Sequence, residues 1–192
     1  MKKKPVPERI LETADRLFKR QGYGETGLNQ LIEESRTAKA SFYQYFPSKE
    51  ALAEAYLERY YESQQSLLRG LMRKYAAPRD FLAAWTRLLY REARNGSLYG
   101  CPMANLRAQI SFSSDALHRS VQRIAKDSIA LLADYLRDAK AAGRLPKNQD
   151  PAKSARRLFS AYEGVLQTWR LTDEQNALED LTVLAESVLE PG

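Results

Sequence analysis

Two short helices joined by a tight turn, expected within residues 26–50, constrain the fold of this chain more than any other feature. The apolar residues Leu28, Leu31 and Ile32 recur at helical spacing before the turn, and the aromatic-rich run KASFYQYF follows it. Pro47 then marks the start of a longer helix. This order of elements is typical of a helix-turn-helix, whose second helix enters the major groove of DNA.

Apolar residues recur at helical spacing along nearly the whole chain, and no segment shows the alternation of a β-strand. A first helix carries an apolar stripe from Ile10 to Phe18, and we expect it to end at Gly22 and Gly24. Asp150 and Pro151 mark the start of a later helix. Beyond the helix-turn-helix, helices are expected at about 48–76, 79–94, 103–110, from 113 or 114 to 143, and at 151–170 and 174–189.

The sequence therefore predicts an all-α fold of roughly nine helices. We expect an N-terminal DNA-binding domain over residues 1–50, with the helix-turn-helix at about 27–46. Residues 51–192 are expected to form a C-terminal helical domain.

The composition, with 44% hydrophobic and 28% charged residues, is typical of a soluble globular protein. No apolar run approaches the ~18 residues that a transmembrane helix needs, and the N-terminal run MKKKPVPER lacks the apolar core of a secretory signal. We therefore expect a cytoplasmic protein with no membrane partner. The single cysteine, Cys101, excludes an intrachain disulfide and a zinc site built on cysteines.

The second short helix has the chemistry that reading DNA requires. Phe42 and Phe46 are expected to face inward, while Gln44 can pair with adenine and Lys39 can reach guanine or a phosphate. The net charge of +6 suits a polyanion only weakly, so this local pattern matters more than the bulk charge. We expect Thr26 to cap the first helix of the pair and to bind phosphate at that helix N-terminus. The expected DNA contacts are Thr26, Arg36, Lys39, Ser41, Tyr43, Gln44, Tyr45 and Lys49; the alternative for the two tyrosines is a small local core.

Three segments of the chain together resemble the TetR family of transcriptional regulators. They are ILETADRLFKRQGY in the first helix, GLNQLIEES in the second, and KASFYQYFPSKEAL across the third and fourth. The resemblance implies a homodimer that binds a double-stranded, quasi-palindromic DNA operator and is usually a repressor released by a small-molecule effector. It also implies that residues 51–192 form the domain that binds the effector and makes the dimer. The last two helices, at about 151–189, are the expected dimer surface, and the long fourth helix is expected to tilt when the effector binds.

The expected turn departs from the family pattern, which commonly has Gly and then Val where this chain has Arg36 and Thr37. Glycine suits a positive φ there, and arginine at such a position costs ~1 kcal/mol. Either the turn is slightly rebuilt, or Arg36 adds a phosphate contact. Ala38 also replaces the hydroxyl residue that usually caps the recognition helix.

Residues 97–111, SLYGCPMANLRAQIS, resemble a Gly-Cys-Pro motif of the NemR-like and AcuR-like subgroup of that family. Some of its members respond to electrophiles or oxidants through this cysteine. Cys101 precedes an expected helix N-terminus, and Arg94 and Arg107 could add a positive field that favours the thiolate. A lone cysteine is more often a small buried apolar residue, and the chain offers no second cysteine to resolve a sulfenic acid.

An apolar or planar effector is expected between the C-terminal helices, although ordinary core packing is the alternative for each residue. The candidate effector-binding residues are Phe81, Trp85, Leu89, Cys101, Met103, Leu106, Ile110, Phe159, Tyr162, Leu166 and Trp169.

Catalysis is not expected from this sequence. The only histidine, His118, lies in a polar helical stretch without an evident partner, which argues against Ser/His or Cys/His chemistry. We find no glycine-rich phosphate loop and no metal-ligand spacing, so neither a metal nor a cofactor is expected. The alternative to a regulator is a helical small-molecule-binding protein without specific DNA readout.

Overall fold

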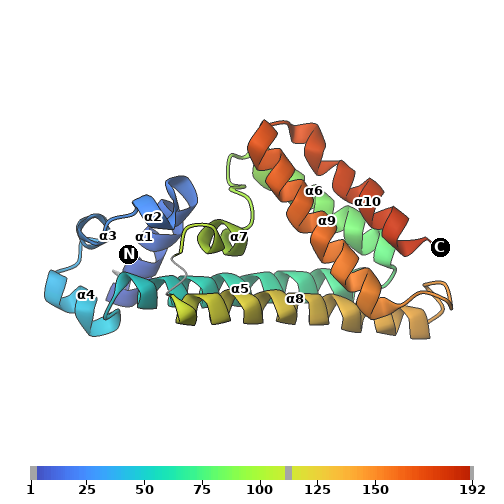
Figure 1. The fold of residues 1–192 in the computed structure, drawn as a ribbon, viewed down its shortest axis with the longest axis horizontal. Helices are drawn as coiled ribbons and strands as arrows, with labels where there is room; N and C mark the ends of the chain where they lie inside the picture. The colour runs from blue at the N-terminus through green and yellow to red at the C-terminus, as the bar shows by residue number, and fades with distance from the viewer. Residues whose placement is uncertain (1–3, 111–113, 191–192) are drawn as a thin grey trace. The chain divides into compact units, whose positions relative to one another are not determined.

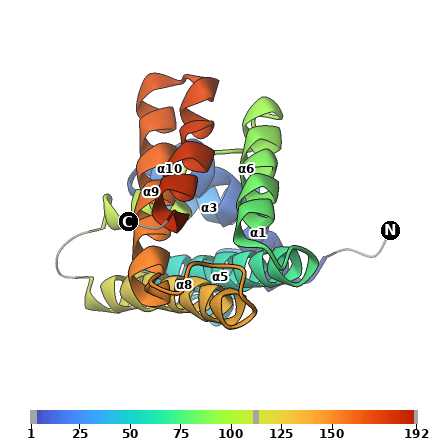
Figure 2. The same cartoon turned by 90° about the vertical axis from the view of Figure 1, so that its right-hand side faces the viewer.

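The computed structural model describes residues 4–110 and 114–190, and within these ranges it contains helices and no strand. This confirms the predicted all-α fold. The elements, shown in Figures 1 and 2, are α1 (Val6–Arg20), α2 (Gly22–Glu25), α3 (Leu28–Glu34), α4 (Lys39–Tyr45), α5 (Lys49–Lys74), α6 (Pro78–Arg94), α7 (Pro102–Arg107), α8 (Asp115–Ala141), α9 (Pro151–Thr172), the 3-10 turn η1 (Gln175–Leu178) and α10 (Asp180–Leu189).

The helices form two compact units. Unit 1 contains Met1–Glu62 and Pro102–Gln122, and unit 2 contains Ser63–Cys101 and Arg123–Gly192. Each of the long helices α5 and α8 therefore has one end in unit 1 and the other end in unit 2. The predicted boundary after residue 50 concerns which residues read DNA and which bind the effector, and it stays a prediction.

The core of unit 1 is built on the apolar stripe of α1. Ile10 and Ala14 are fully buried, and Phe18 is nearly so. The ring of Phe18 lies edge-on to Tyr23, with centroids 5.4 Å apart, and edge-on to Tyr56 of α5 at 5.3 Å. This aromatic group joins α1, α2 and α5, and α1 also contacts α3 and α4. The first helix thus serves as the platform on which the two short helices are held.

The end of α1 contains an extra helical turn that the sequence did not predict. The helix ends at Arg20, close to the predicted stop, but Gly22 with φ of 88° starts the short helix α2 instead of a loop. The side chain of Gln109, which follows α7, accepts a hydrogen bond from the Gly24 N–H at 2.8 Å. The glycines therefore allow a tight corner on which α7 can dock.

Unit 2 is a packed group of helices in which α10 lies against both α9 and α6 (Figures 1 and 2). Its interior carries a chain of aromatic rings: Tyr135 is 5.0 Å from Phe81, Phe81 is 5.7 Å from Trp85, and Trp85 stacks on Tyr162 at 4.6 Å and 20°. The Tyr135 hydroxyl also donates to the carbonyl of Tyr75 at 2.7 Å, which ties α8 to the end of α5.

The start of α9 follows the sequence prediction. Pro151 occupies the first helical position, and the Asp150 carboxylate accepts hydrogen bonds from the backbone N–H groups of Ala152 at 2.9 Å and Lys153 at 3.1 Å. These bonds, the one from Lys153 first, lower the pKa of Asp150, as expected for an acid that caps a helix N-terminus.

We predict that Gly22→Ala destabilises the protein by about 1–2 kcal/mol, because a side chain at positive φ is strained. The new Cβ would also lie 2.5 Å from Gln109 Oε1, which would have to give up its bond to Gly24. The measurement is the midpoint of urea unfolding. Gly24→Ala is the matched control, because its Cβ meets the same atom at an ordinary 3.6 Å; equal midpoints for the two variants would contradict the prediction.

Candidate functional site

The second helix of the pair, α4, has one buried and one exposed face. Phe42 is fully buried and Phe46 is 7% exposed, with their rings 6.1 Å apart, which confirms that both point inward. Tyr43 and Tyr45 are 40% and 45% exposed, so they belong to the outer face and not to a local core. The outer face therefore presents hydroxyl groups on a helix that its own aromatic residues anchor.

Two further polar side chains of α4 are free to bind a partner. Lys39 and Gln44 are exposed and form no hydrogen bond or ion pair with any described residue, whereas Ser41 is partly buried. Ala38 is the N-cap of α4 and makes no side-chain capping bond, as its lack of a hydroxyl predicts. One short helix thus presents an amide group and an ammonium group that form no hydrogen bond with any described residue.

The turn between α3 and α4 is a Schellman motif centred on Arg36. The Thr37 N–H donates to the carbonyl of Ile32 at 3.1 Å, and the Arg36 N–H donates to that of Glu33 at 2.9 Å. Arg36 has φ of 51°, the left-handed conformation that glycine adopts most easily. The expectation of a positive φ here is confirmed, so the turn keeps this shape despite the arginine.

The side chain of Arg9, in α1, binds the same turn, and the sequence did not predict this contact. Its Nε donates to the carbonyl of Ser35 at 3.3 Å, and its Nη2 donates to the carbonyl of Arg36 at 3.2 Å. A guanidinium is well suited to this position because the carbonyl end of a helix carries partial negative charge. Arg9 lies 26 and 27 residues from its partners, so no local sequence pattern could have revealed the contact.

The predicted capping role of Thr26 is wrong. The N-cap of α3 is Gly27, without a side-chain bond, and Thr26 is instead fully buried at the end of α2. Its hydroxyl donates to the carbonyl of Gly22 at 2.6 Å. The prediction failed because a helical turn, absent from the sequence reading, precedes α3 and uses the hydroxyl inside the unit.

Lys49 stands at the start of α5, as expected, but its ammonium group already has partners. It donates to the carbonyl of Gly24 at 3.3 Å and lies 4.3 Å from the centroid of the Tyr23 ring. Partial burial lowers the pKa of Lys49, and the nearby Glu25 opposes that change. A phosphate contact by Lys49 would therefore compete with an internal contact.

The predicted effector-binding residues are nearly all buried, but they do not belong to one unit. Met103, Leu106 and Ile110 lie in unit 1. Those in unit 2 are Phe81, Trp85, Leu89, Cys101, Phe159, Tyr162, Leu166 and Trp169, of which Phe159 and Trp169 are only partly buried.

The surroundings of Cys101 differ from the positive environment expected. The thiol is buried and donates a hydrogen bond to the carboxylate of Glu163, a residue of α9 that sequence reasoning missed. Arg94 lies exposed on the surface of α6. Burial raises the pKa of Glu163, and the bond from Cys101 partly offsets that rise.

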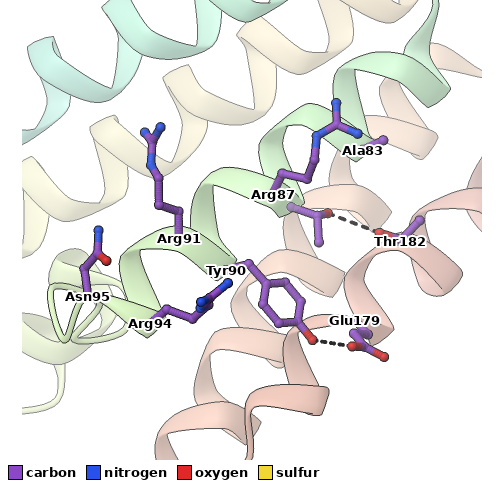
Figure 3. Close-up of a pocket in the computed structure, with 9 residues that line it drawn as sticks. Ala83, Arg87, Tyr90, Arg91, Arg94, Asn95, Glu179 and Thr182 are labelled. Carbon is purple, nitrogen blue, oxygen red and sulfur yellow. Dashed lines mark hydrogen bonds between the residues drawn. The ribbon is translucent and has the colours of Figure 1, made fainter.

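A basic groove of about 680 Å³ lies between α6 and the segment formed by η1 and α10 (Figure 3). Arg87, Arg91 and Arg94 project from α6 at spacings of four and three residues, and none forms an ion pair with a described residue. The Tyr90 hydroxyl donates a hydrogen bond to the Glu179 carboxylate at 2.6 Å across the groove. The pKa of Tyr90 is raised to about 12, mainly by burial and secondly by this bond. None of these groove residues was predicted as a ligand-binding residue.

Among the described residues, no group of three or more His, Cys, Asp or Glu side chains could hold a metal ion. The helices of the described ranges are all too short or too polar to cross a membrane.

Two family models match the chain. "Bacterial regulatory proteins, tetR family" matches residues 10–56, and "Tetracyclin repressor-like, C-terminal domain" matches residues 77–183, which is more than half of the chain. The first model spans α4 and its turn, and the second spans most of unit 2.

Curated relatives and solved structures agree with these matches. The HTH-type transcriptional repressor NemR of Escherichia coli is 27% identical over 95% of this chain and 92% of its own. The HTH-type transcriptional regulator LmrA of Bacillus subtilis is 32% identical over 68% of this chain and 70% of its own. The reduced form of E. coli NemR superposes with a TM-score of 0.85 at 26% identity, covering 97% of this chain and 99% of that one.

We predict that Arg36→Gly raises stability by about 0.5–1 kcal/mol, because it removes the strain of a side chain at positive φ. If the guanidinium also binds a phosphate, the same change weakens DNA binding and lowers the slope of log affinity against log salt by about 1. Urea unfolding and a salt titration of DNA binding measure the two effects.

Arg36→Ala is the matched control for this prediction, since it removes the charge but keeps the strained conformation. It should lose as much DNA affinity as the glycine variant without gaining stability. A glycine variant that is less stable than the wild type would contradict the strain argument.

Proposed function

This chain belongs to the tetR family of bacterial regulatory proteins, and we propose that it is a homodimeric repressor that α4 anchors on a palindromic DNA operator. The observation that carries the proposal is the exposed face of α4. Lys39 and Gln44 on this face form no hydrogen bond or ion pair with a described residue, while the buried rings of Phe42 and Phe46 hold the helix against the core of unit 1. Such a regulator acts on DNA in the cytoplasm and releases it when a small effector binds unit 2.

Each exposed group of the α3–α4 region has a role in this proposal. Gln44 pairs with the edge of an adenine, and Lys39 reaches a guanine or a phosphate. Thr26 is left out because its hydroxyl is committed inside unit 1. The hydroxyl groups of Ser41, Tyr43 and Tyr45 and the cationic groups of Arg36 and Lys49 contact the flanking backbone and hold the register.

Exposed apolar side chains near the end of the chain support a dimer through α9 and α10. Leu171, Val183 and Leu184 are 76%, 66% and 44% exposed, and all three lie in the two helices that the family resemblance assigns to the dimer. Burying such side chains against a second copy is favourable, and a twofold dimer fits an operator whose half-sites lie ~34–36 Å apart.

The long helix α5 supports a coupling between the effector and DNA. It runs without interruption from Lys49 to Lys74, and the division between the units falls after Glu62, within the helix. An effector that shifts the tilt of α5 would change the separation of the two recognition helices in the dimer. A coupling free energy of ~1–3 kcal/mol is enough to release the operator.

We expect purified protein to bind the DNA that flanks its own gene tightly, with two protomers per short site and in the presence of excess nonspecific competitor. Gln44→Ala and Lys39→Ala should each weaken this binding by ~1–3 kcal/mol without changing the unfolding temperature. Fluorescence anisotropy measures the affinity. Lys147→Ala, an exposed lysine of unit 2, is the control. Equal, salt-sensitive binding to scrambled DNA would favour a ligand-binding protein without DNA readout.

We also predict that the double change Val183→Glu and Leu184→Glu separates the dimer, because it places two charges in the proposed interface. Sedimentation equilibrium should show a monomer, and operator affinity should fall in parallel. Leu67→Glu introduces the same charge at a leucine of α5 that is 36% exposed and should leave the dimer intact. A double variant that remains dimeric would place the interface elsewhere.

A further inference from the structure

We propose that Glu163 is the recognition group of the effector site, and that the effector carries a cationic or N–H-donating group bound to this carboxylate beside the aromatic rings of unit 2. The proposal rests on the effector-controlled function above and adds the chemical class of the effector. A neutral apolar ligand would satisfy the pocket expected from the sequence, but it would leave this carboxylate unused.

The first observation is that the carboxylate of Glu163 is only half satisfied. Its Oε1 is inaccessible to solvent and has no hydrogen-bond partner among the described residues, and Glu163 forms no ion pair with them. The one hydrogen bond to this group comes from the thiol of Cys101. Buried carboxylates in folded proteins are normally paired with a cation or with several donors, so the Oε1 atom of Glu163 can still accept a hydrogen bond from a donor outside the chain.

The second observation is another unpartnered polar side chain in the same unit. Gln65 of α5 is 8% exposed, and neither its amide nitrogen nor its amide oxygen has a partner among the described residues. Gln65 also lies on the part of α5 that belongs to unit 2, just past the point where the helix leaves unit 1. A ligand that bonds to Gln65 would therefore act on the helix proposed to transmit the signal.

The third observation concerns the aromatic residues of the same unit, one of which is the sequence neighbour of Glu163. Tyr162 precedes it on α9 and stacks on Trp85 at 4.6 Å and 20°, and the chain of rings continues to Phe81. The faces of aromatic rings carry partial negative charge and attract cations. The carboxylate, which has no cationic partner among the described residues, and these rings both favour a planar cation over an anion.

The basic groove of unit 2 offers the opposite preference. Arg87, Arg91 and Arg94 would attract an anion, and they lie on the exposed side of α6, whereas Glu163 Oε1 is inaccessible. A comparison of ligands with equal shape and different charge therefore distinguishes the two sites.

The experiment uses the full-length protein and three probes of nearly equal size: benzamidinium, neutral benzamide and benzoate. Binding is measured by calorimetry and by the shift of the unfolding temperature, with Trp fluorescence as an independent signal. We expect benzamidinium to bind most tightly, benzamide more weakly and benzoate most weakly, with any benzoate binding confined to the basic groove and lost in Arg91→Ala. This comparison is made on the wild-type protein, so it does not depend on the folding of any variant.

Glu163→Gln should weaken benzamidinium binding at least tenfold, which corresponds to the loss of one charge-assisted contact. Glu186→Gln, at an exposed acid of α10, is the matched control and should bind like the wild type. Gln65→Leu should also weaken binding while raising the unfolding temperature, because it removes an unpaired buried amide.

Several results would overturn the proposal. Absence of benzamidinium binding at millimolar concentration, or affinity unchanged in Glu163→Gln, would show that the carboxylate is not a recognition group. Preferential binding of benzoate, abolished by Arg91→Ala, would place the ligand in the basic groove instead. None of these measurements involves DNA, so a failure to find an operator would bear on the proposed function and not on this site.

Discussion

The angle between α3 and α4 depends on how the carbonyl groups at the end of α3 are satisfied. Two of them accept bonds from the backbone of the Schellman turn, and the carbonyls of Ser35 and Arg36 accept bonds from Arg9. The turn thus requires both a left-handed residue and a cation from α1. Because α1 also provides the apolar platform of unit 1, the same helix fixes the height and the angle of α4. This arrangement fixes the orientation of α4, and therefore the direction in which its exposed Gln44 amide and Lys39 ammonium groups point.

Unit 2 separates its charges in a way that restricts what it can bind. Its outer groove presents three arginines without acidic partners, while its interior contains a carboxylate without a cationic partner. The unsatisfied Oε1 atom of Glu163 and the unpaired amide of Gln65 lower the stability of the unliganded protein, since buried polar atoms without partners are unfavourable. Binding sites commonly show this conflict between stability and function, and a ligand that supplies the missing donors stabilises the bound state.

Features encoded by neighbouring residues were predictable from the sequence, and contacts between distant residues were not. The helices, the inward Phe42 and Phe46 and the start of α9 at Pro151 follow from local spacing and from the backbone preference of proline. The positive φ of Arg36 was expected from the family resemblance, because the family pattern has glycine at that position. The hydrogen bonds from Arg9 to the turn between α3 and α4, and the bond between Cys101 and Glu163, join residues that are far apart in sequence. Thr26 was predicted to cap α3, but the short helix α2, which was not predicted, ends at this residue. Its hydroxyl is therefore used inside unit 1 and not at the surface.

The contact between Cys101 and Glu163 also bears on whether the thiol senses reactive compounds. The thiol is the donor in this hydrogen bond and therefore carries its proton in the contact, and a protonated thiol is less nucleophilic than a thiolate. A cationic effector bound to Glu163, as proposed above, would compete with the thiol for this carboxylate. The proposed effector site and the single cysteine of the chain therefore share one partner, and a change in one of them affects the other.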